Sequence, residues 1–121
     1  MFNLFQSSAP RPAPMTPQQA IARAATDEIV VIDVREPGEI AASGAAEGAV
    51  RIPMATLRMK ADPRSPECVP ELKSGKPVAI YCAAGGRAGM ACQMLDEMGH
   101  AEVHNIGGFG HWASAGGPVV R

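Results

Sequence analysis

The sequence predicts one α/β domain in which a parallel sheet is flanked by helices on both faces. Two apolar runs, Ile29–Ile32 and Pro77–Cys82, support this prediction, because strands that are apolar on both faces are typical of the interior of a parallel sheet. The strongest helical pattern of the chain follows the second run, at 88–98. Strands that alternate with helices favour a parallel sheet covered by helices.

The length and composition of the chain exclude several classes of protein. Its 121 residues suit one domain, and 46% hydrophobic with 19% charged residues is an ordinary globular mixture. The net charge of −1 leaves no basic surface that could hold nucleic acid. Apolar runs fall far short of the ~20 residues that span a bilayer, so we expect no membrane partner. The start of the chain lacks the features of a signal peptide, and three cysteines make no even disulfide set, so we expect a cytoplasmic location.

The predicted elements begin after a tail. Residues 1–14 are predicted to be a flexible, proline-rich tail, because three prolines alternate in them, and the domain occupies residues 15–121. Thr16-Pro17-Gln18-Gln19 has the pattern of a capping box with proline at the first helical position. This pattern predicts a helix over 16–25.

Shorter elements are predicted along the rest of the chain. Between the two strands we expect a helix that ends at Ala42, a strand at 50–53, a helix near 55–60 and one helical turn at 69–72. After Cys82, apolar residues repeat at helical spacing over 88–98, and Gly99 ends that helix. We expect the chain to finish with a strand at 101–106, a turn at Gly107-Gly108 and a short helix at 109–115.

A cysteine stands where this fold places its ligands. Cys82 ends a predicted buried strand, and ligands of open α/β sheets bind beyond the carboxyl ends of the strands. The residues that follow are small and include no proline, so every N–H from Ala83 to Ala88 is free to curl around the sulfur. Arg87 adds a positive charge, and a helix N-terminus follows. These features predict a Cys82 pKa below that of a free thiol. The alternative is a small buried cysteine at a strand end.

Five segments, in the right order, resemble motifs of the single-domain rhodaneses, a sulfurtransferase family. Together they run from about residue 15 to the end of the chain. They are an entry helix at Thr16–Gln19, an Asp-Val-Arg turn at Asp33–Glu39, a Gly-Ala-x-x-Ile-Pro segment at Gly48–Pro53, a Cys-x-x-Gly-x-Arg-Ala active loop at Cys82–Ala88, and a Gly-Gly-x-x-x-Trp ending from Gly107 to Trp112.

The resemblance implies a fold, an activity and a set of site residues. The sheet would have about five parallel strands. Cys82 would be the nucleophile that takes a sulfane sulfur from a small-molecule donor such as thiosulfate and passes it, as a persulfide, to cyanide in an assay or to a thiol or protein in the cell. No cofactor is implied. The donor would be bound by the active loop, that is by Ala83, Ala84, Gly85, Gly86, Arg87 and Ala88.

The resemblance leaves open the roles of two arginines. Arg87 would either orient the oxyanion of the donor, so that its loss weakens anionic donors most, or fix the loop through its guanidinium. Arg51 stands where many relatives have Asn or His, and it is a candidate for a rim charge that faces an anionic donor. A solvated arginine at a strand edge is the alternative.

Ser43–Glu47 departs from the family, because relatives have a Gly-His-Ile there.

Other titratable residues have structural interpretations. We interpret Asp33, Arg35 and Glu39 as an ion-pair and capping network that lies near the site only because neighbouring strands end together. Cys92 is either a resolving thiol or a helix-packing residue, and Cys68 lies in a proline-flanked loop, exposed and open to oxidation. The histidines have no metal-ligand spacing, so we expect no metal. Met90, Met94 and Met98 are expected to fill the core, Met54 and Met59 to line a rim near the site, and Trp112 to pack the last helix on the sheet.

Three functional alternatives remain at this point. A cysteine phosphatase or arsenate reductase can share this fold, but such enzymes use Cys-x5-Arg, and the spacing from Cys82 to Arg87 is one residue shorter. A binding module without activity commonly lacks the cysteine, which is present here. The third alternative is a persulfide carrier that works only with a protein partner.

Overall fold

The computed structural model of the chain describes residues 14–121. Its main sheet has four parallel strands, in the order β4 (Val50–Arg51), β2 (Val30–Asp33), β5 (Val78–Cys82) and β6 (Val103–Gly108). The predicted α/β class and parallel sheet are confirmed. The predicted tail over residues 1–14 lies, apart from Pro14, outside the described residues.

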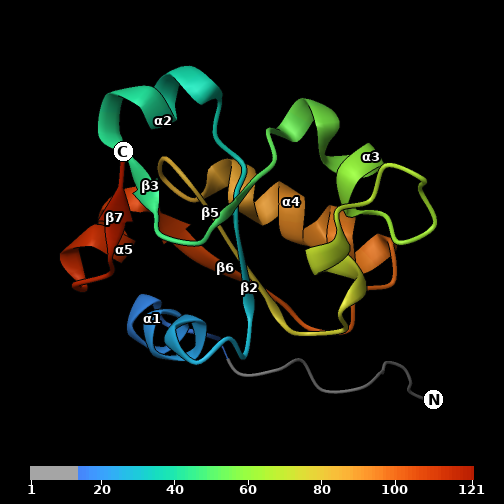
Figure 1. The fold of residues 1–121 in the computed structure, drawn as a ribbon, viewed down its shortest axis with the longest axis horizontal. Coiled ribbons are helices and arrows are strands. Elements are labelled where there is room, and N and C mark those ends of the chain that lie inside the picture. The colour runs from blue at the N-terminus through green and yellow to red at the C-terminus, as the bar shows by residue number, and fades with distance from the viewer. Residues whose placement is uncertain (1–13) are drawn as a thin grey trace, which may run out of the picture.

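The parallel sheet has four strands in the described part of the chain, one fewer than the five that the family resemblance implies. Two further short strands, β3 (Ala45–Ala46) and β7 (Val119–Val120), pair with each other in antiparallel orientation. Figure 1 shows β7 and the C-terminus beside β3, at one end of the molecule. The segment at 43–47, which departs from the family motif, is therefore held by its pairing with β7.

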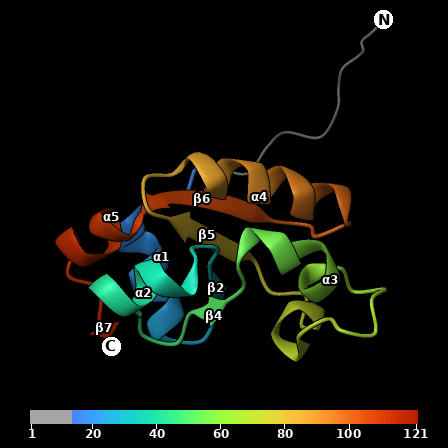
Figure 2. The same ribbon diagram turned by 90° about the horizontal axis from the view of Figure 1, so that it is seen from above.

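Helices cover both faces of the sheet (Figures 1 and 2). One face packs against α3 and α4 and the other against α1 and α5, while α2 follows the carboxyl end of β2. The helices are α1 (Pro17–Ala25), α2 (Pro37–Ser43), α3 (Leu57–Ala61), α4 (Gly86–Glu97) and α5 (Phe109–Ser114), with 3₁₀ turns η1 (Met54–Thr56) and η2 (Pro70–Lys73). No helix among residues 14–121 is long and apolar enough to cross a membrane.

Local sequence signals explain where the helices begin. The capping box of α1 is present: Thr16 Oγ1 accepts the Gln19 N–H at 3.1 Å, and Gln19 Oε1 accepts the Thr16 N–H at 3.0 Å. Helix α4 begins at Gly86, two residues before the predicted start at Ala88, because Gly85 with φ +109° turns the chain into the helix directly. The Gly107-Gly108 pair is not a turn; it forms the last two residues of β6.

The sheet separates two apolar clusters. Ile32, Ile80 and Leu95 belong to the cluster under α3 and α4, and Trp112, which is 1% exposed, belongs to the cluster under α1 and α5. The ring of Trp112 stacks on Tyr81 with 6.5 Å between centroids, so its predicted packing role is confirmed.

The methionine prediction is only partly correct. Met98 is buried and Met94 packs against the core, as expected. Met90, in contrast, is 56% exposed. Met59, which was expected at a rim rather than in the core, is 43% exposed. Met90 faces solvent because the buried stripe of α4 is formed by Ala88, Ala91 and Leu95.

Candidate functional site

Cys82 lies at the carboxyl end of β5, where it is only 1% exposed. Its Sγ accepts two backbone hydrogen bonds from the loop that follows, from the N–H of Gly85 at 2.9 Å and from the N–H of Ala88 at 3.4 Å. The small residues after the strand thus allow the backbone to curl around the sulfur.

Two opposing effects act on the pKa of the Cys82 thiol. Burial raises the pKa, because an ionised sulfur loses contact with water. Backbone N–H groups lower it and outweigh burial; they belong to Ala88, Gly85, Ala84 and Arg87. The pKa of Cys82 therefore lies below that of an ordinary thiol, which favours a nucleophilic thiolate. Helix α4 starts at Gly86, within this loop, and adds the positive end of a helix dipole.

The end of β6 packs tightly against this loop. A Cβ added to Gly108 would lie 2.2 Å from the carbonyl oxygen of Ala83, so only glycine fits there. The Nδ2 of Asn105 donates to the Gly85 carbonyl at 3.0 Å, and the Oδ1 of the same side chain accepts the Gly107 N–H at 2.8 Å. The loop is therefore supported from the neighbouring strand as well as by α4.

The guanidinium of Arg87 is engaged by an acidic partner. Its Nη1 and Nη2 donate to the two carboxylate oxygens of Glu39, at 2.7 and 2.8 Å, and both side chains are about one third exposed. This hydrogen bonding lowers the pKa of Glu39 to about 2 and raises the pKa of Arg87. Glu39 thus contacts the active loop directly, which corrects the prediction that it lies nearby only because neighbouring strands end together.

Asp33 and Arg35 form a separate, buried network, as predicted. Arg35 donates through Nε and Nη2 to the Asp33 carboxylate, at distances down to 2.8 Å, and the two side chains are 3% and 0% exposed. The Tyr81 hydroxyl donates to Asp33 at 2.7 Å and accepts the Ala46 N–H at 2.9 Å. Arg35 also donates to the carbonyl of Gly44 at 2.8 Å. This network joins β2, β5 and the segment that contains Gly44 and Ala46.

Arg51 is exposed at the end of the edge strand β4. It is paired in register with Asp33 of β2, and β5 with Cys82 lies one strand further. Arg51 lines a hollow of about 230 Å³ with Arg35 and Arg121, and Cys82 is not among the lining residues. Arg51 thus lies at the exposed edge of the sheet, and its role as a rim charge stays a prediction.

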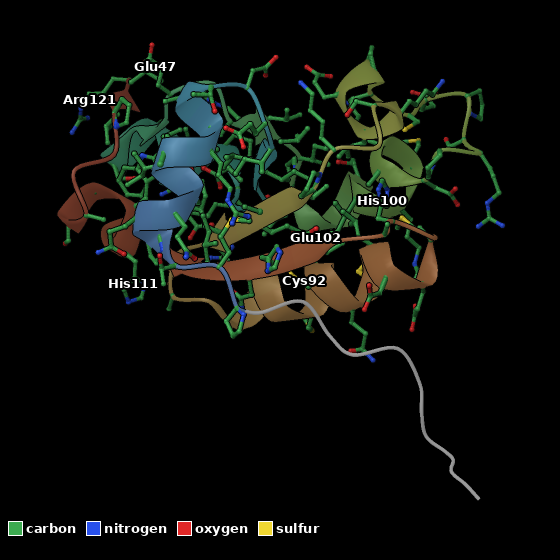
Figure 3. The ribbon with its side chains drawn as sticks, turned by 90° about the horizontal axis from the view of Figure 1, so that it is seen from below. Glu47, Cys92, His100, Glu102, His111 and Arg121 are labelled. Atoms are coloured by element: carbon green, nitrogen blue, oxygen red, sulfur yellow. The ribbon has the colours of Figure 1, made fainter. Side chains whose placement is uncertain are left out.

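The other two cysteines differ from Cys82 in their surroundings. Cys68 is 8% exposed and packs in the core, so the expectation that it is exposed is wrong. Burial raises the pKa of Cys68, and burial together with the charge of Asp96 raises that of Cys92 to about 12. Cys92 lies on α4 beside β6 (Figure 3). Packing is therefore the role that the structure supports for both thiols.

Each of the three histidines bonds a partner of its own. Figure 3 shows His100 and His111 at opposite ends of the molecule. His100 Nε2 bonds the Ala61 carbonyl, His104 Nε2 bonds Glu102, and His111 Nδ1 accepts the Gly108 N–H. Residues 14–121 contain no group of three or more His, Cys, Asp or Glu side chains that could hold a metal ion.

Comparison with known families identifies this arrangement. The family model of the rhodanese-like domain matches residues 16–115, which include the whole sheet, the Cys82 loop and Glu39. The chain belongs to the rhodanese-like family. Within this rhodanese-like domain, Cys82 and the loop that follows it lie inside the matched residues.

Two curated proteins are similar in sequence to the rhodanese-like domain. It is 36% identical over 91 residues to uncharacterized protein YqhL of Bacillus subtilis (strain 168), covering 74% of this chain and 65% of that protein. It is 35% identical over 77 residues to thiosulfate sulfurtransferase PspE of Escherichia coli (strain K12), covering 64% of this chain and 67% of that protein. The matches thus span about two thirds of the length of either relative.

Solved structures share the fold of the rhodanese-like domain. A protein of unknown function from Rhodopseudomonas palustris CGA009, described as a possible tyrosine phosphatase, is 34% identical with a TM-score of 0.78, covering 88% of this chain and 83% of that chain. A rhodanese-related protein from Thermoplasma volcanium is 28% identical with a TM-score of 0.66, covering 88% and 96%.

Sequence reasoning missed two supports of the Cys82 loop in this rhodanese-like domain. Glu39 and Arg87 are 48 positions apart, and no local sequence pattern around either residue indicates that their side chains pair. Asn105 stands two residues before the Gly107-Gly108 pair. That spacing, on the same strand, is the signal that could have drawn attention to it.

Proposed function

We propose that the protein is a sulfurtransferase that moves a sulfane sulfur from a donor such as thiosulfate to a thiophilic acceptor through a persulfide on Cys82. The observation that carries the proposal is the pair of hydrogen bonds that the N–H groups of Gly85 and Ala88 donate to the Cys82 sulfur, which lower the pKa of this thiol. Membership of the rhodanese-like family and the similarity to a protein named thiosulfate sulfurtransferase support it.

The reaction has two displacement steps. In the first, the Cys82 thiolate attacks the outer sulfur of thiosulfate; a sulfur–sulfur bond to Cys82 forms, the bond from that sulfur to the sulfonate breaks, and sulfite leaves with the electron pair. In the second, cyanide or a thiolate attacks the outer persulfide sulfur, and Cys82 leaves as a thiolate. The N–H groups around the sulfur stabilise the negative charge in both forms.

The acceptor in the cell is proposed to be a thiol, carried by a small molecule or by a protein. Ala83, Ala84 and Gly86 are exposed and present no polar side chain. Selection of a donor or acceptor by side chains would therefore come from neighbouring segments rather than from the loop.

A phosphatase is the competing enzyme, because one similar structure is described as a possible tyrosine phosphatase. Two features of this chain disfavour it. The spacing from Cys82 to Arg87 is Cys-x4-Arg, and both terminal nitrogens of Arg87 already bond Glu39. A phosphate group would need that guanidinium for its own oxygens.

The test is intact mass spectrometry before and after incubation with thiosulfate, with and without cyanide. We expect the wild type to gain one sulfur atom that cyanide removes, and Cys82→Ser to gain none. Cys92→Ser and Cys68→Ser are the matched controls, and both are expected to load as the wild type does. Loading without turnover on cyanide or small thiols would instead indicate a partner-dependent carrier.

Absence of loading by thiosulfate and by polysulfide, in a protein whose Cys82 is readily alkylated, would contradict the proposal. Hydrolysis of an aryl phosphate by the same sample, lost in Cys82→Ser, would then assign the phosphatase activity.

A further inference from the structure

Asn105 is an exposed residue of β6 that makes two directed hydrogen bonds beside the active loop. Its Nδ2 donates to the carbonyl of Gly85 at 3.0 Å, and its Oδ1 accepts the N–H of Gly107 at 2.8 Å. Only one orientation of the amide satisfies both bonds, because one partner is an acceptor and the other a donor. The side chain therefore connects the loop to the end of the adjacent strand in a fixed geometry.

The carbonyl that Asn105 holds belongs to the residue that bonds the sulfur. The N–H of Gly85 donates to Cys82 Sγ at 2.9 Å, closer than the N–H of Ala88 at 3.4 Å. Gly85 has φ +109°, a region in which glycine has wide conformational freedom. A residue with that freedom needs contacts from outside the loop to keep its N–H directed at one point.

The side chain of Asn105 is also packed closely between the loop and α4. A Cβ added to Gly89, one turn along α4, would lie 3.5 Å from Asn105 Nδ2, and one added to Gly85 would lie 3.5 Å from the Cα of Gly107. The amide thus packs over the first turn of α4. The N–H of Gly89 also donates to the Gly85 carbonyl, at 3.0 Å, so this oxygen is held by the helix and by the strand.

We propose that Asn105 is a positioning residue: by tying Gly85 to the end of β6, it fixes the N–H that stabilises negative charge on the Cys82 sulfur. Asn105 does not touch the reacting atoms and acts through Gly85. The proposal deepens the proposed function, since it names a residue outside the active loop that sets the reactivity of the sulfur carrier. Because Asn105 is exposed, water can replace its hydrogen bonds in a variant, but water cannot hold the Gly85 carbonyl, and through it the backbone angles of Gly85, in one geometry.

The test is the pH dependence of Cys82 alkylation by iodoacetamide, measured by mass spectrometry of the peptide that contains Cys82 and without a sulfur donor. Asn105→Leu, which keeps the size of the side chain, and Asn105→Ala are expected to raise the midpoint by roughly one pH unit, because a misdirected donor loses most of a charge-assisted hydrogen bond. Gln93→Leu is the matched control. Gln93 is an exposed amide on α4 that lines a surface hollow together with Asn105, and it has no hydrogen bond to the loop among the described residues. Its midpoint is expected to equal that of the wild type.

Thermal unfolding of each variant separates positioning from stability. We expect Asn105→Leu to remain folded at the assay temperature with a raised alkylation midpoint. A midpoint equal to that of the wild type in both folded Asn105 variants would overturn the proposal, whatever their stability. Failure of the wild type to load sulfur would contradict the proposed function alone, since the alkylation profile contains no sulfur-transfer step.

Discussion

The carboxylate of Glu39 on α2 holds both terminal nitrogens of Arg87, at 2.7 and 2.8 Å, and so ties α2 to the helix that follows the active loop. Arg87 also contributes its backbone N–H to the group that lowers the pKa of Cys82. One residue therefore joins the loop to α2 with its side chain and faces the sulfur with its backbone. This favours the second of the two roles considered for Arg87, that of fixing the loop.

Arg87→Ala and Glu39→Gln are expected to slow sulfur transfer by similar factors, roughly tenfold, because either change frees the loop from α2. The factor is expected to be the same for thiosulfate and for an uncharged donor such as an organic trisulfide. Steady-state kinetics of the single and double variants with both donors measure these factors. The double variant is expected to transfer sulfur only slightly more slowly than either single variant. A loss with thiosulfate alone, confined to Arg87→Ala, would instead show that the guanidinium binds the anionic donor.

The pairing of Glu39 also predicts a pH dependence of stability. The pKa of Glu39 is lowered from 4.5 to about 2 in the folded protein, mainly by the hydrogen bond from Arg87. A lowered pKa stabilises the folded state above pH 4.5, and this contribution is lost as the pH falls from about 4.5 to about 2. The unfolding temperatures of wild type and Glu39→Gln should therefore differ at pH 7 and converge at pH 2. A constant difference over this range would contradict the assignment.

Gly108→Ala is expected to lower the free energy of unfolding by about 1–3 kcal/mol, because its methyl group would overlap the carbonyl of Ala83. It should also slow alkylation of Cys82 by moving the loop. Gly110→Ala is the matched control, since a Cβ at Gly110 meets no atom within 4 Å. Urea denaturation and alkylation kinetics of the two variants measure the effect. Equal behaviour of both would mean that β6 does not constrain the loop.

Arg35→Leu is expected to destabilise the fold by about 3–5 kcal/mol, because it leaves the buried carboxylate of Asp33 without its cation. Tyr81→Phe is expected to cost about 1–3 kcal/mol, since it removes the hydroxyl that joins Asp33 to the Ala46 N–H. Urea denaturation measures both free energies. In the folded variants the pH midpoint of Cys82 alkylation should stay near that of the wild type. A shift as large as that expected for Asn105→Leu would show that this network also sets the reactivity of Cys82.

Local sequence patterns were sufficient to predict most of the helices and strands. The buried runs that became β2 and β5, the capping box of α1 and the apolar stripe of α4 are short-range features, and each was visible in a single window of the chain. The predictions were wrong where the same sequence pattern is compatible with a buried and with an exposed side chain. A loop cysteine such as Cys68 and a helical methionine such as Met90 are buried or exposed according to what packs over them.

For the active loop, the sequence by itself determined which residue is the candidate nucleophile and why it is activated. Cys82 at the end of a buried strand, followed by small residues without proline and by a helix, is enough to predict a sulfur surrounded by N–H groups. Only the tertiary structure decided what holds that loop in place. Glu39 and Arg87 are 48 positions apart, and Asn105 and Gly85 are 20 apart. Such contacts depend on how neighbouring strands are ordered and aligned, and no local periodicity in the chain specifies that arrangement.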